Sequence, residues 1–281
     1  MVERTGWAPL RRHALLLLGV VLVAFPIYIA LVASTHPAAD IIAHFPLWFG
    51  TRLVSNYAHT ITAGIGSAGA PPVGRMLLNS LAMALGISIG KIVISLLSAY
   101  AVVYFRFPLR RSCFWLIFIT LILPVQVRIL PTYQVVADLH MLDTYSGLIV
   151  PLIASATATF FLRQFLLTVP DELLEAALID GAGPVRFFFD FVLPLSRTTI
   201  AALFVVEFIY GWNLYLWPLI VTTKQSMYTI VMGIQHLANV PDATPPWNWI
   251  MATTVLAILP PLGIVIAMQR FLVKGFIEPE K

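Results

Sequence analysis

The chain has 281 residues, of which 59% are hydrophobic and only 11% are charged, and this composition excludes an ordinary soluble domain. Its one cysteine, Cys113, excludes an internal disulfide, and a net charge of +4 is not a nucleic-acid-binding signature here. Apolar runs of about 20 residues recur along the chain, and a helix of that length crosses a bilayer. The composition therefore predicts an all-α membrane protein.

Six apolar runs predict six transmembrane helices. They cover residues 13–33, 76–105, 112–130, 146–167, 198–221 and 249–272. The first run is too long for a signal peptide and lacks a convincing cleavage site, so it is interpreted as an uncleaved span in which Pro26 is tolerated. In the second run Ala82, Gly86 and Gly90 fall four residues apart, and such small residues let two membrane helices approach closely.

The distribution of Lys and Arg predicts the orientation. With both termini in the cytoplasm, twelve of the seventeen basic residues fall in inner segments and three in outer ones. The predicted parts are a cytoplasmic N-terminus (1–12), a first span (13–33), a periplasmic segment with one interfacial helix (34–75), a core of five spans (76–272) and a cytoplasmic tail (273–281). The core contains one long cytoplasmic loop, at 168–196.

That loop is acidic, although the chain has few charges. Pro170 and the acids Asp171 and Glu172 are typical of the first turn of a helix, where the helix dipole favours negative charge. Gly181 and Gly183 are both able to end this helix in the left-handed conformation. A second short helix then carries four phenylalanines, Phe187, Phe188, Phe189 and Phe191. Exposed phenylalanines promote aggregation unless they dock, so the loop is predicted to bind a partner surface.

The spacing E-A-A-x-x-x-G, starting at Glu175 and followed by F-V-L-P, resembles the EAA loop of bacterial ABC importer permeases. In that family the loop is the coupling helix, which fits a groove of the ATPase subunit. An ordinary interfacial helix is the alternative, but such helices are usually basic. Phe191 replaces the usual isoleucine, a mild apolar departure. The resemblance assigns ATPase coupling to Glu175, Ala176, Ala177, Asp180, Gly181, Arg186, Phe187, Phe188 and Pro194.

Within this loop the resemblance gives each kind of residue a role. Glu175 anchors the helix by charge or by capping, the two alanines allow close approach, Gly181 forms the elbow, and the phenylalanines fill the groove. The stretch G-I-S-I-G-K at 86–91 is not a phosphate loop, because its spacing is one residue short and Ile92 replaces Ser or Thr. The chain is therefore predicted to bind no ATP itself.

Other stretches are similar to carbohydrate-type importer permeases, namely 75–81, 97–110, 121–132, 152–165 and 208–219. Over nearly the whole chain, the similarity is to permease subunits that carry sn-glycerol 3-phosphate, with glycerophosphodiesters as further cargo. The resemblance implies a type I importer fold in the bacterial inner membrane, with spans two to six as its core. It implies a sister permease, an ATPase homodimer that holds ATP and Mg²⁺, and a periplasmic substrate-binding protein. It implies no enzyme activity, cofactor, metal or nucleic acid for the chain itself.

Charged residues inside the apolar runs mark a candidate translocation path, because a charge in a bilayer needs a partner or water. Lys91 and Glu207 lie near the middle of two runs and either pair with each other or line a water-filled path. Arg128 either contacts an anionic substrate or extends to the outer headgroups. Gln126, Tyr210 and Asn213, with Trp212 and Tyr215, complete the candidate path, and anchoring at the membrane interface is the alternative for the aromatic residues. We find no metal-ligand cluster and no nucleophile–base pair, so no catalytic site is predicted.

The mechanism that follows from the resemblance is ATP-driven alternating access. A neutral sugar or a disaccharide is the alternative cargo within the same class. An ion-coupled secondary transporter is the alternative from another class, and Lys91 and Glu207 are its only support. That transporter, like a purely structural membrane subunit, leaves the acidic loop without a role.

Overall fold

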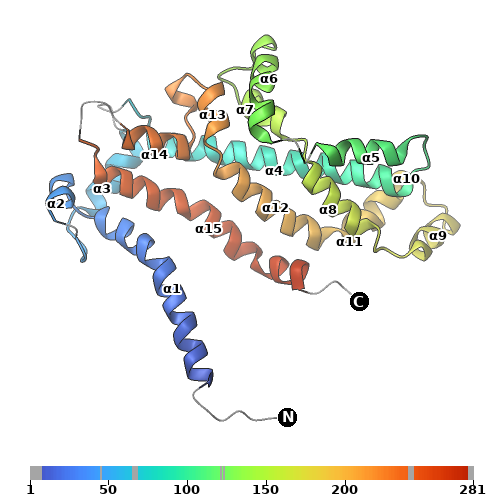
Figure 1. The fold of residues 1–281 in the computed structure, drawn as a ribbon, viewed down its shortest axis with the longest axis horizontal. Coiled ribbons are helices and arrows are strands. Elements are labelled where there is room, and N and C mark those ends of the chain that lie inside the picture. Colours follow the sequence, from blue (N-terminus) through green and yellow to red (C-terminus); the bar gives the residue numbers. More distant parts are fainter. Residues whose placement is uncertain are drawn as a thin grey trace. The chain divides into compact units, whose positions relative to one another are not determined.

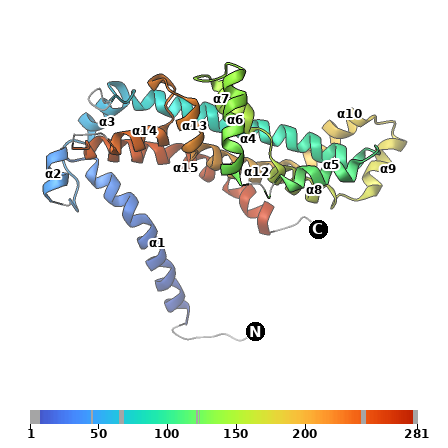
Figure 2. The same ribbon diagram turned by 45° about the horizontal axis from the view of Figure 1, so that its top comes forward.

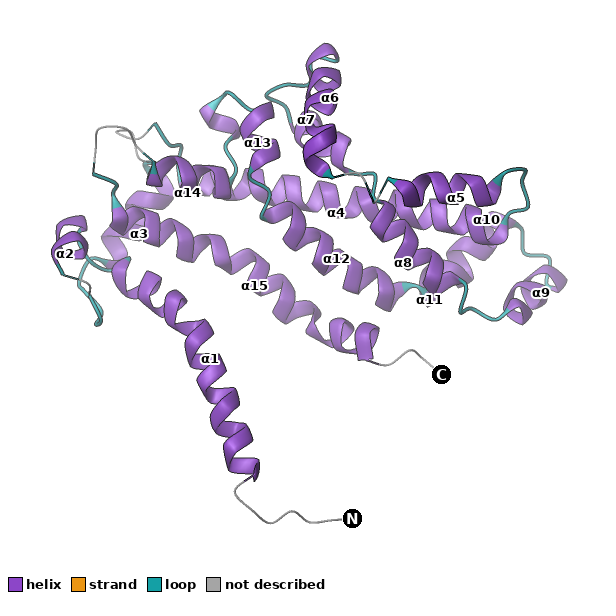
Figure 3. Ribbon diagram, in the orientation of Figure 1, coloured by secondary structure: helices purple, strands orange, loops and turns teal. Residues whose placement is uncertain are grey.

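The computed structural model describes residues 8–44, 46–64, 69–120, 122, 124–239 and 244–277. Across these ranges the chain is helical and contains no strand, so the predicted all-α class is confirmed (Figure 3). The chain divides into two compact units, one of residues 1–75 and 233–259, the other of residues 76–232 and 260–281. Each unit is described by itself.

The helices are, in chain order, α1 (Ala8–Ala33), α2 (Ala38–Ala43), α3 (Leu53–Thr62), α4 (Val73–Tyr104), α5 (Arg110–Ile119), α6 (Val125–Asp138), α7 (Tyr145–Ile149), α8 (Ala156–Leu166), α9 (Asp171–Ile179), α10 (Pro184–Phe187), α11 (Leu193–Leu195), α12 (Arg197–Trp212), α13 (Leu216–Val221), α14 (Ile230–Ala238) and α15 (Trp247–Ile277) (Figure 1). Short 3₁₀ turns lie at Val150–Leu152 and Gln225–Met227, and a π-helical turn at Phe188–Val192.

Among the described residues, three helices are long and apolar enough to cross a membrane unbroken: Leu10–Ala33, Val73–Tyr104 and Trp247–Phe271. Two more candidates are bent pairs of helices, Tyr145–Leu152 with Ala156–Leu166 at 47° and Pro184–Leu195 with Arg197–Trp212 at 70°. The third predicted run falls on α5 and α6, which are separate helices. Pro124 is the N-cap of α6 with an extended backbone, and a proline in that conformation starts a new helix rather than continuing the previous one.

The first unit surrounds a buried asparagine. The Asn56 side-chain amide donates to the carbonyl oxygens of Ser34 and His36 at 2.8 and 3.0 Å. Its oxygen accepts a hydrogen bond from the side chain of Asn248 at 3.2 Å. The ring of His59 stacks on that of Trp249, with 4.4 Å between the centroids. These contacts join α3 to the end of α1 and the start of α15, and two short helices, α2 and α3, stand where one interfacial helix was predicted.

The second unit is assembled on α4. One apolar cluster joins Tyr100 of α4 to Leu162 of α8 and to Phe187 of α10, and another joins Met83 of α4 to α6, α7 and α13. The predicted small-residue stripe lies in a close contact, because a Cβ on Gly86 would be 2.7 Å from the Ile149 side chain. A Cβ on Gly90 would be 2.5 Å from the side chain of Ile153. Glycine is therefore required where α4 meets the bend between α7 and α8.

Candidate functional site

The loop at 168–196 forms the bent helical pair that its sequence predicts. The helix α9 begins directly after Pro170 and ends at Asp180. Gly181 follows with φ +74°, and the amide of Ala182 donates to the carbonyl of Ala177 at 2.8 Å, which closes the helix. Gly183 has φ −71° and an extended backbone, so the elbow needs glycine only at Gly181. In both ribbon views α9 projects at one end of its unit (Figures 1 and 2).

The elbow is tied to α4 by a hydrogen bond and by aromatic contacts. The hydroxyl of Tyr100 donates to the carbonyl of Pro184 at 2.8 Å. Phe187 is buried and lies against Tyr104 and Phe191, with ring centroids 5.3 and 5.5 Å apart. Phe188 is half-buried, 5.1 Å from the ring of Tyr100. The prediction that the phenylalanines fill a partner groove is therefore wrong for Phe187, whose side chain belongs to the core of this unit.

Four other apolar side chains of this loop point into solvent instead. These elbow residues are Leu178, Ile179, Val185 and Phe189, and Ile179 is 85% exposed. Ile179 and Val185 were not predicted from the sequence as contact residues. Their position as apolar residues on both sides of Gly181 could have indicated an exposed apolar surface. The four are separated by only a few residues, so a partner that grips the elbow meets an apolar surface.

The other residues predicted to couple to an ATPase differ in exposure. Glu175, Ala176 and Asp180 are exposed, Ala177 is buried and Pro194 is half-buried. Arg186 Nε donates to Asp190 Oδ2 at 3.2 Å, one turn along the loop. Among the described residues, Glu175 and Asp180 have no basic side chain within 4.0 Å. Both carboxylates thus remain open to a partner.

Lys91 and Glu207 pair directly. Lys91 Nζ of α4 lies 2.7 Å from Glu207 Oε2 of α12, and both side chains are less than 10% exposed. The hydroxyl of Ser155 donates to the other carboxylate oxygen at 3.5 Å. The Nζ atom also lies 3.9 Å from the centroid of the Tyr210 ring, a cation–π contact. The pairing interpretation is confirmed, and the buried charges are compensated.

A small cavity adjoins this ion pair. It has a volume of about 170 Å³, and its walls include Lys91, Arg128 and Tyr210, three of the predicted path residues. Thr132 and Trp217 also line it, and sequence analysis did not name them. The two interpretations of Lys91 are therefore compatible, since its side chain both pairs with Glu207 and lines the cavity. Lys91 is compensated by Glu207, whereas Arg128 has no carboxylate within 4.0 Å among the described residues, so Arg128 is the lining residue that favours an anion.

The other predicted path residues lie elsewhere. Asn213 follows the end of α12, where its side chain donates to the carbonyl of Ile209 at 2.9 Å, and it does not line the cavity. Trp212 is buried against Phe208, with the ring centroids 5.7 Å apart, so it does not face a path. Tyr215 is partly exposed at the break between α12 and α13. The side chain of Gln126 lies outside the described residues.

A buried asparagine, Asn79, and an aspartate with a left-handed backbone, Asp143, both hold the segment at 223–228 by hydrogen bonds. The Asn79 side-chain amide donates to the carbonyls of Ser226 and Tyr228, both at 2.9 Å. Asp143, with φ +56°, accepts hydrogen bonds from the amides of Thr223 and Lys224 at 2.6 and 2.8 Å. Burial acts to raise the pKa of Asp143, but these amides, the Thr223 hydroxyl and the charge of Lys224 together lower it below its ordinary value.

The loop, the ion pair and the fold together define a membrane subunit of an importer, and comparison with known proteins agrees. Residues 91–278 match the family described as binding-protein-dependent transport system inner membrane component. The chain belongs to this family of transport permeases. Such a subunit works with a substrate-binding protein and an ATPase, and it is a transport component rather than an enzyme.

Named relatives are similar over their whole length. The sn-glycerol-3-phosphate transport system permease protein UgpE of Rhizobium meliloti (strain 1021) is 53% identical over 282 residues, which cover 100% of both chains. The proteins of that name in Agrobacterium fabrum and Yersinia enterocolitica are 54% and 52% identical, again over 100% of both chains.

A solved structure has the same fold. A chain in the crystal structure of a bacterial ABC transporter involved in the import of the acidic polysaccharide alginate superposes with a TM-score of 0.76. The alignment covers 99% of each chain at 18% sequence identity. Identity this low is informative about the fold alone. The predicted importer-permease fold is thereby confirmed.

Proposed function

We propose that this chain is the permease subunit of an ABC importer that carries sn-glycerol 3-phosphate, and glycerophosphodiesters of similar size, across the bacterial inner membrane. The observation that carries the cargo is the 52–54% identity, over the full length, with relatives named for this substrate. The cavity beside Lys91 and Arg128 supports an anionic cargo, since guanidinium and ammonium groups suit a phosphate.

The subunit acts by alternating access. The partner ATPase homodimer binds ATP with Mg²⁺ and closes, and it grips the elbow residues and the free carboxylates Glu175 and Asp180. The elbow moves as a rigid body and pulls on α4 through the Tyr100–Pro184 hydrogen bond. Tyr100 and Lys91 lie nine residues apart on this one helix, and a helix transmits displacement along its axis. The movement therefore reaches the cavity, where Lys91 and Arg128 line the path.

The proposed assembly and orientation follow from the same picture. A sister permease completes the translocation path, and a periplasmic substrate-binding protein delivers the cargo. Both termini and the loop at 168–196 face the cytoplasm, because the inner segments hold most of the basic residues. Lys91 and Glu207 pair directly, which supports a structural role for these two buried charges. The acidic loop at 168–196 supports an ATPase partner, so ATP is proposed as the energy source.

Uptake of radiolabelled sn-glycerol 3-phosphate tests the proposal. Cells that lack this chain but keep its partner subunits should take up no label, and restoring the chain should restore uptake. Arg128→Gln should raise the KM roughly tenfold or more, because a charge-assisted hydrogen bond contributes about 1.5–3 kcal/mol. Arg52→Gln, an exposed arginine that does not line the cavity, is the control. Restored uptake of a disaccharide instead of the phosphate ester would replace the cargo but keep the importer.

A further inference from the structure

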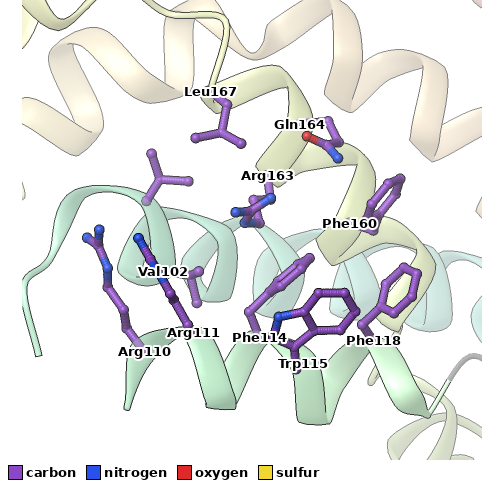
Figure 4. Close-up of a pocket in the computed structure, with 11 residues that line it drawn as sticks. Val102, Arg110, Arg111, Phe114, Trp115, Phe118, Phe160, Arg163, Gln164 and Leu167 are labelled. Carbon is purple, nitrogen blue, oxygen red and sulfur yellow. The ribbon is translucent and has the colours of Figure 1, made fainter. Parts of the chain in front are cut away.

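A second, larger cavity lies away from the proposed path. It has a volume of about 440 Å³ and lies within the second unit, between the end of α4, α5 and α8 (Figure 4). None of its lining residues lines the cavity beside Lys91. Its size is typical of a site for a small molecule or a headgroup.

Three arginines surround this cavity. Arg110 and Arg111 reach into it from the start of α5, and Arg163 reaches into it from α8, so that the three guanidinium groups lie at the same side (Figure 4). In the described part of the chain, none of them has a carboxylate within 4.0 Å. Three positive charges that share one cavity repel one another, and a bound anion removes that repulsion.

Arg163 has a buried hydrogen-bond donor, its Nε atom, without a partner among the described residues. Its guanidinium lies 4.1 Å from the centroid of the Phe114 ring, a contact that uses the face of the group and not its N–H donors. A buried donor without a partner costs about 1–3 kcal/mol, so the site favours a ligand rich in acceptor oxygens. Arg110 donates one hydrogen bond to the carbonyl of Phe105 at 3.3 Å, and its other N–H donors remain available to a ligand.

Part of the cavity wall is aromatic and continues onto an exposed face of α5. Along α5, Phe114, Trp115 and Phe118 continue the row that Arg110 and Arg111 begin, and Phe160 of α8 lies opposite Phe118 (Figure 4). Trp115 is 57% exposed and its neighbour Leu116 is 66% exposed, so α5 presents an apolar face outward. A basic cluster beside an aromatic and aliphatic surface is the arrangement found at headgroup depth in a membrane.

We propose that this cavity binds the phosphate of an anionic phospholipid, with the three arginines on the phosphate oxygens and the acyl chains along α5. Placement in the cytoplasmic leaflet rests on the orientation given in the proposed function. Since α8 leads directly into α9, a lipid that joins α5 to α8 also steadies the base of the coupling loop. Free inorganic phosphate would bind the arginines in the same way, but it has no acyl chains to contact the aromatic wall.

Lipid-dependent thermal unfolding of the purified, assembled importer tests the proposal without measuring transport. The complex in a neutral detergent is titrated with phosphatidylglycerol, with phosphatidylcholine or with inorganic phosphate. Phosphatidylglycerol should raise the Tm of the wild-type complex by several degrees, and phosphatidylcholine should not. The double variant Arg110→Gln/Arg111→Gln should lose this response. Arg106→Gln is the matched control, because Arg106 lies in the same basic turn but does not line the cavity.

Three outcomes overturn the proposal. They are equal responses to the two lipids, an unchanged response in the double variant, and an equal loss in Arg106→Gln. Inorganic phosphate that reproduces the full shift and abolishes the response to lipid would overturn the lipid as the source of the phosphate. Because the readout is binding and not uptake, a wrong cargo assignment leaves this test intact. Native mass spectrometry of the same complexes counts the retained lipids, and the double variant should retain fewer.

Discussion

The hydroxyl of Tyr100, near the end of α4, donates a hydrogen bond of 2.8 Å to the carbonyl of Pro184, the first residue of α10. This bond joins the elbow at Gly181 to the helix that carries Lys91. One turn further along α4, the hydroxyl of Tyr104 is buried and has no hydrogen-bond partner among the described residues. The two tyrosines therefore form a natural comparison, since both pack on Phe187 but only one bonds the elbow.

Tyr100→Phe should weaken the coupling of ATP hydrolysis to transport. The change removes one hydrogen bond and leaves the Pro184 carbonyl unmet, at a cost of about 1 kcal/mol. The ratio of substrate transported to ATP hydrolysed in proteoliposomes should fall. Tyr104→Phe removes a hydroxyl that bonds nothing and should leave the ratio unchanged. An equal effect of the two variants would show that aromatic packing, and not the hydrogen bond, transmits the movement.

Lys91→Met should destabilise the protein by about 3–5 kcal/mol, because it leaves the Glu207 carboxylate buried without its partner. The double variant Lys91→Met/Glu207→Leu should recover most of that loss, since it removes both charges. Thermal unfolding in detergent of the wild type, of Lys91→Met, of Glu207→Leu and of the double variant gives the coupling energy of the pair. Additive losses in the double variant would contradict direct pairing.

Gly181→Ala should reduce uptake, whereas Gly183→Ala should not. Neither glycine has a heavy atom within 4 Å of an added Cβ, so crowding is absent at both positions. They differ in backbone conformation, and the left-handed φ of +74° at Gly181 costs a residue with a side chain about 1–2 kcal/mol. Uptake is measured in cells that hold equal amounts of the two variants in the membrane. Equal uptake by both variants would mean that the elbow tolerates a different turn.

Stability should fall in acid through Asp143. The pKa of Asp143 is lowered in the folded chain, so its contribution is fully present above the unfolded pKa, about 3.9, and is lost as the pH falls through the folded value. The difference in Tm between wild type and Asp143→Asn should be constant above about pH 5 and shrink below about pH 4. Asp138→Asn changes an exposed carboxyl on the preceding helix and should show no such trend. A difference in Tm between wild type and Asp143→Asn that grows as the pH falls would contradict a lowered pKa of Asp143.

Much of the backbone conformation of the loop at 168–196 could be predicted from the sequence. Pro170, the acids after it and Gly181 carry local conformational preferences, and these preferences act in the same way whatever surrounds them. The start of α9 and its left-handed end follow from them. The direction in which each phenylalanine side chain points does not follow from local preferences. A four-residue helix and a π-helical turn change which side chains share a face. Only the packing against Tyr104 places Phe187 inside, and Phe189 is left outside.

By itself, the sequence determined a helical membrane protein with a bent helical loop, since bilayer thickness and local backbone preferences act on short stretches. The tertiary structure decided which distant residues meet. Lys91 and Glu207 are 116 positions apart, and their choice between pairing and lining a path depended on how α4 lies against α12. The three arginines around the larger cavity likewise come together only because α5 packs on α8. Contacts of this kind depend on helix register and bend angles, which no single stretch encodes.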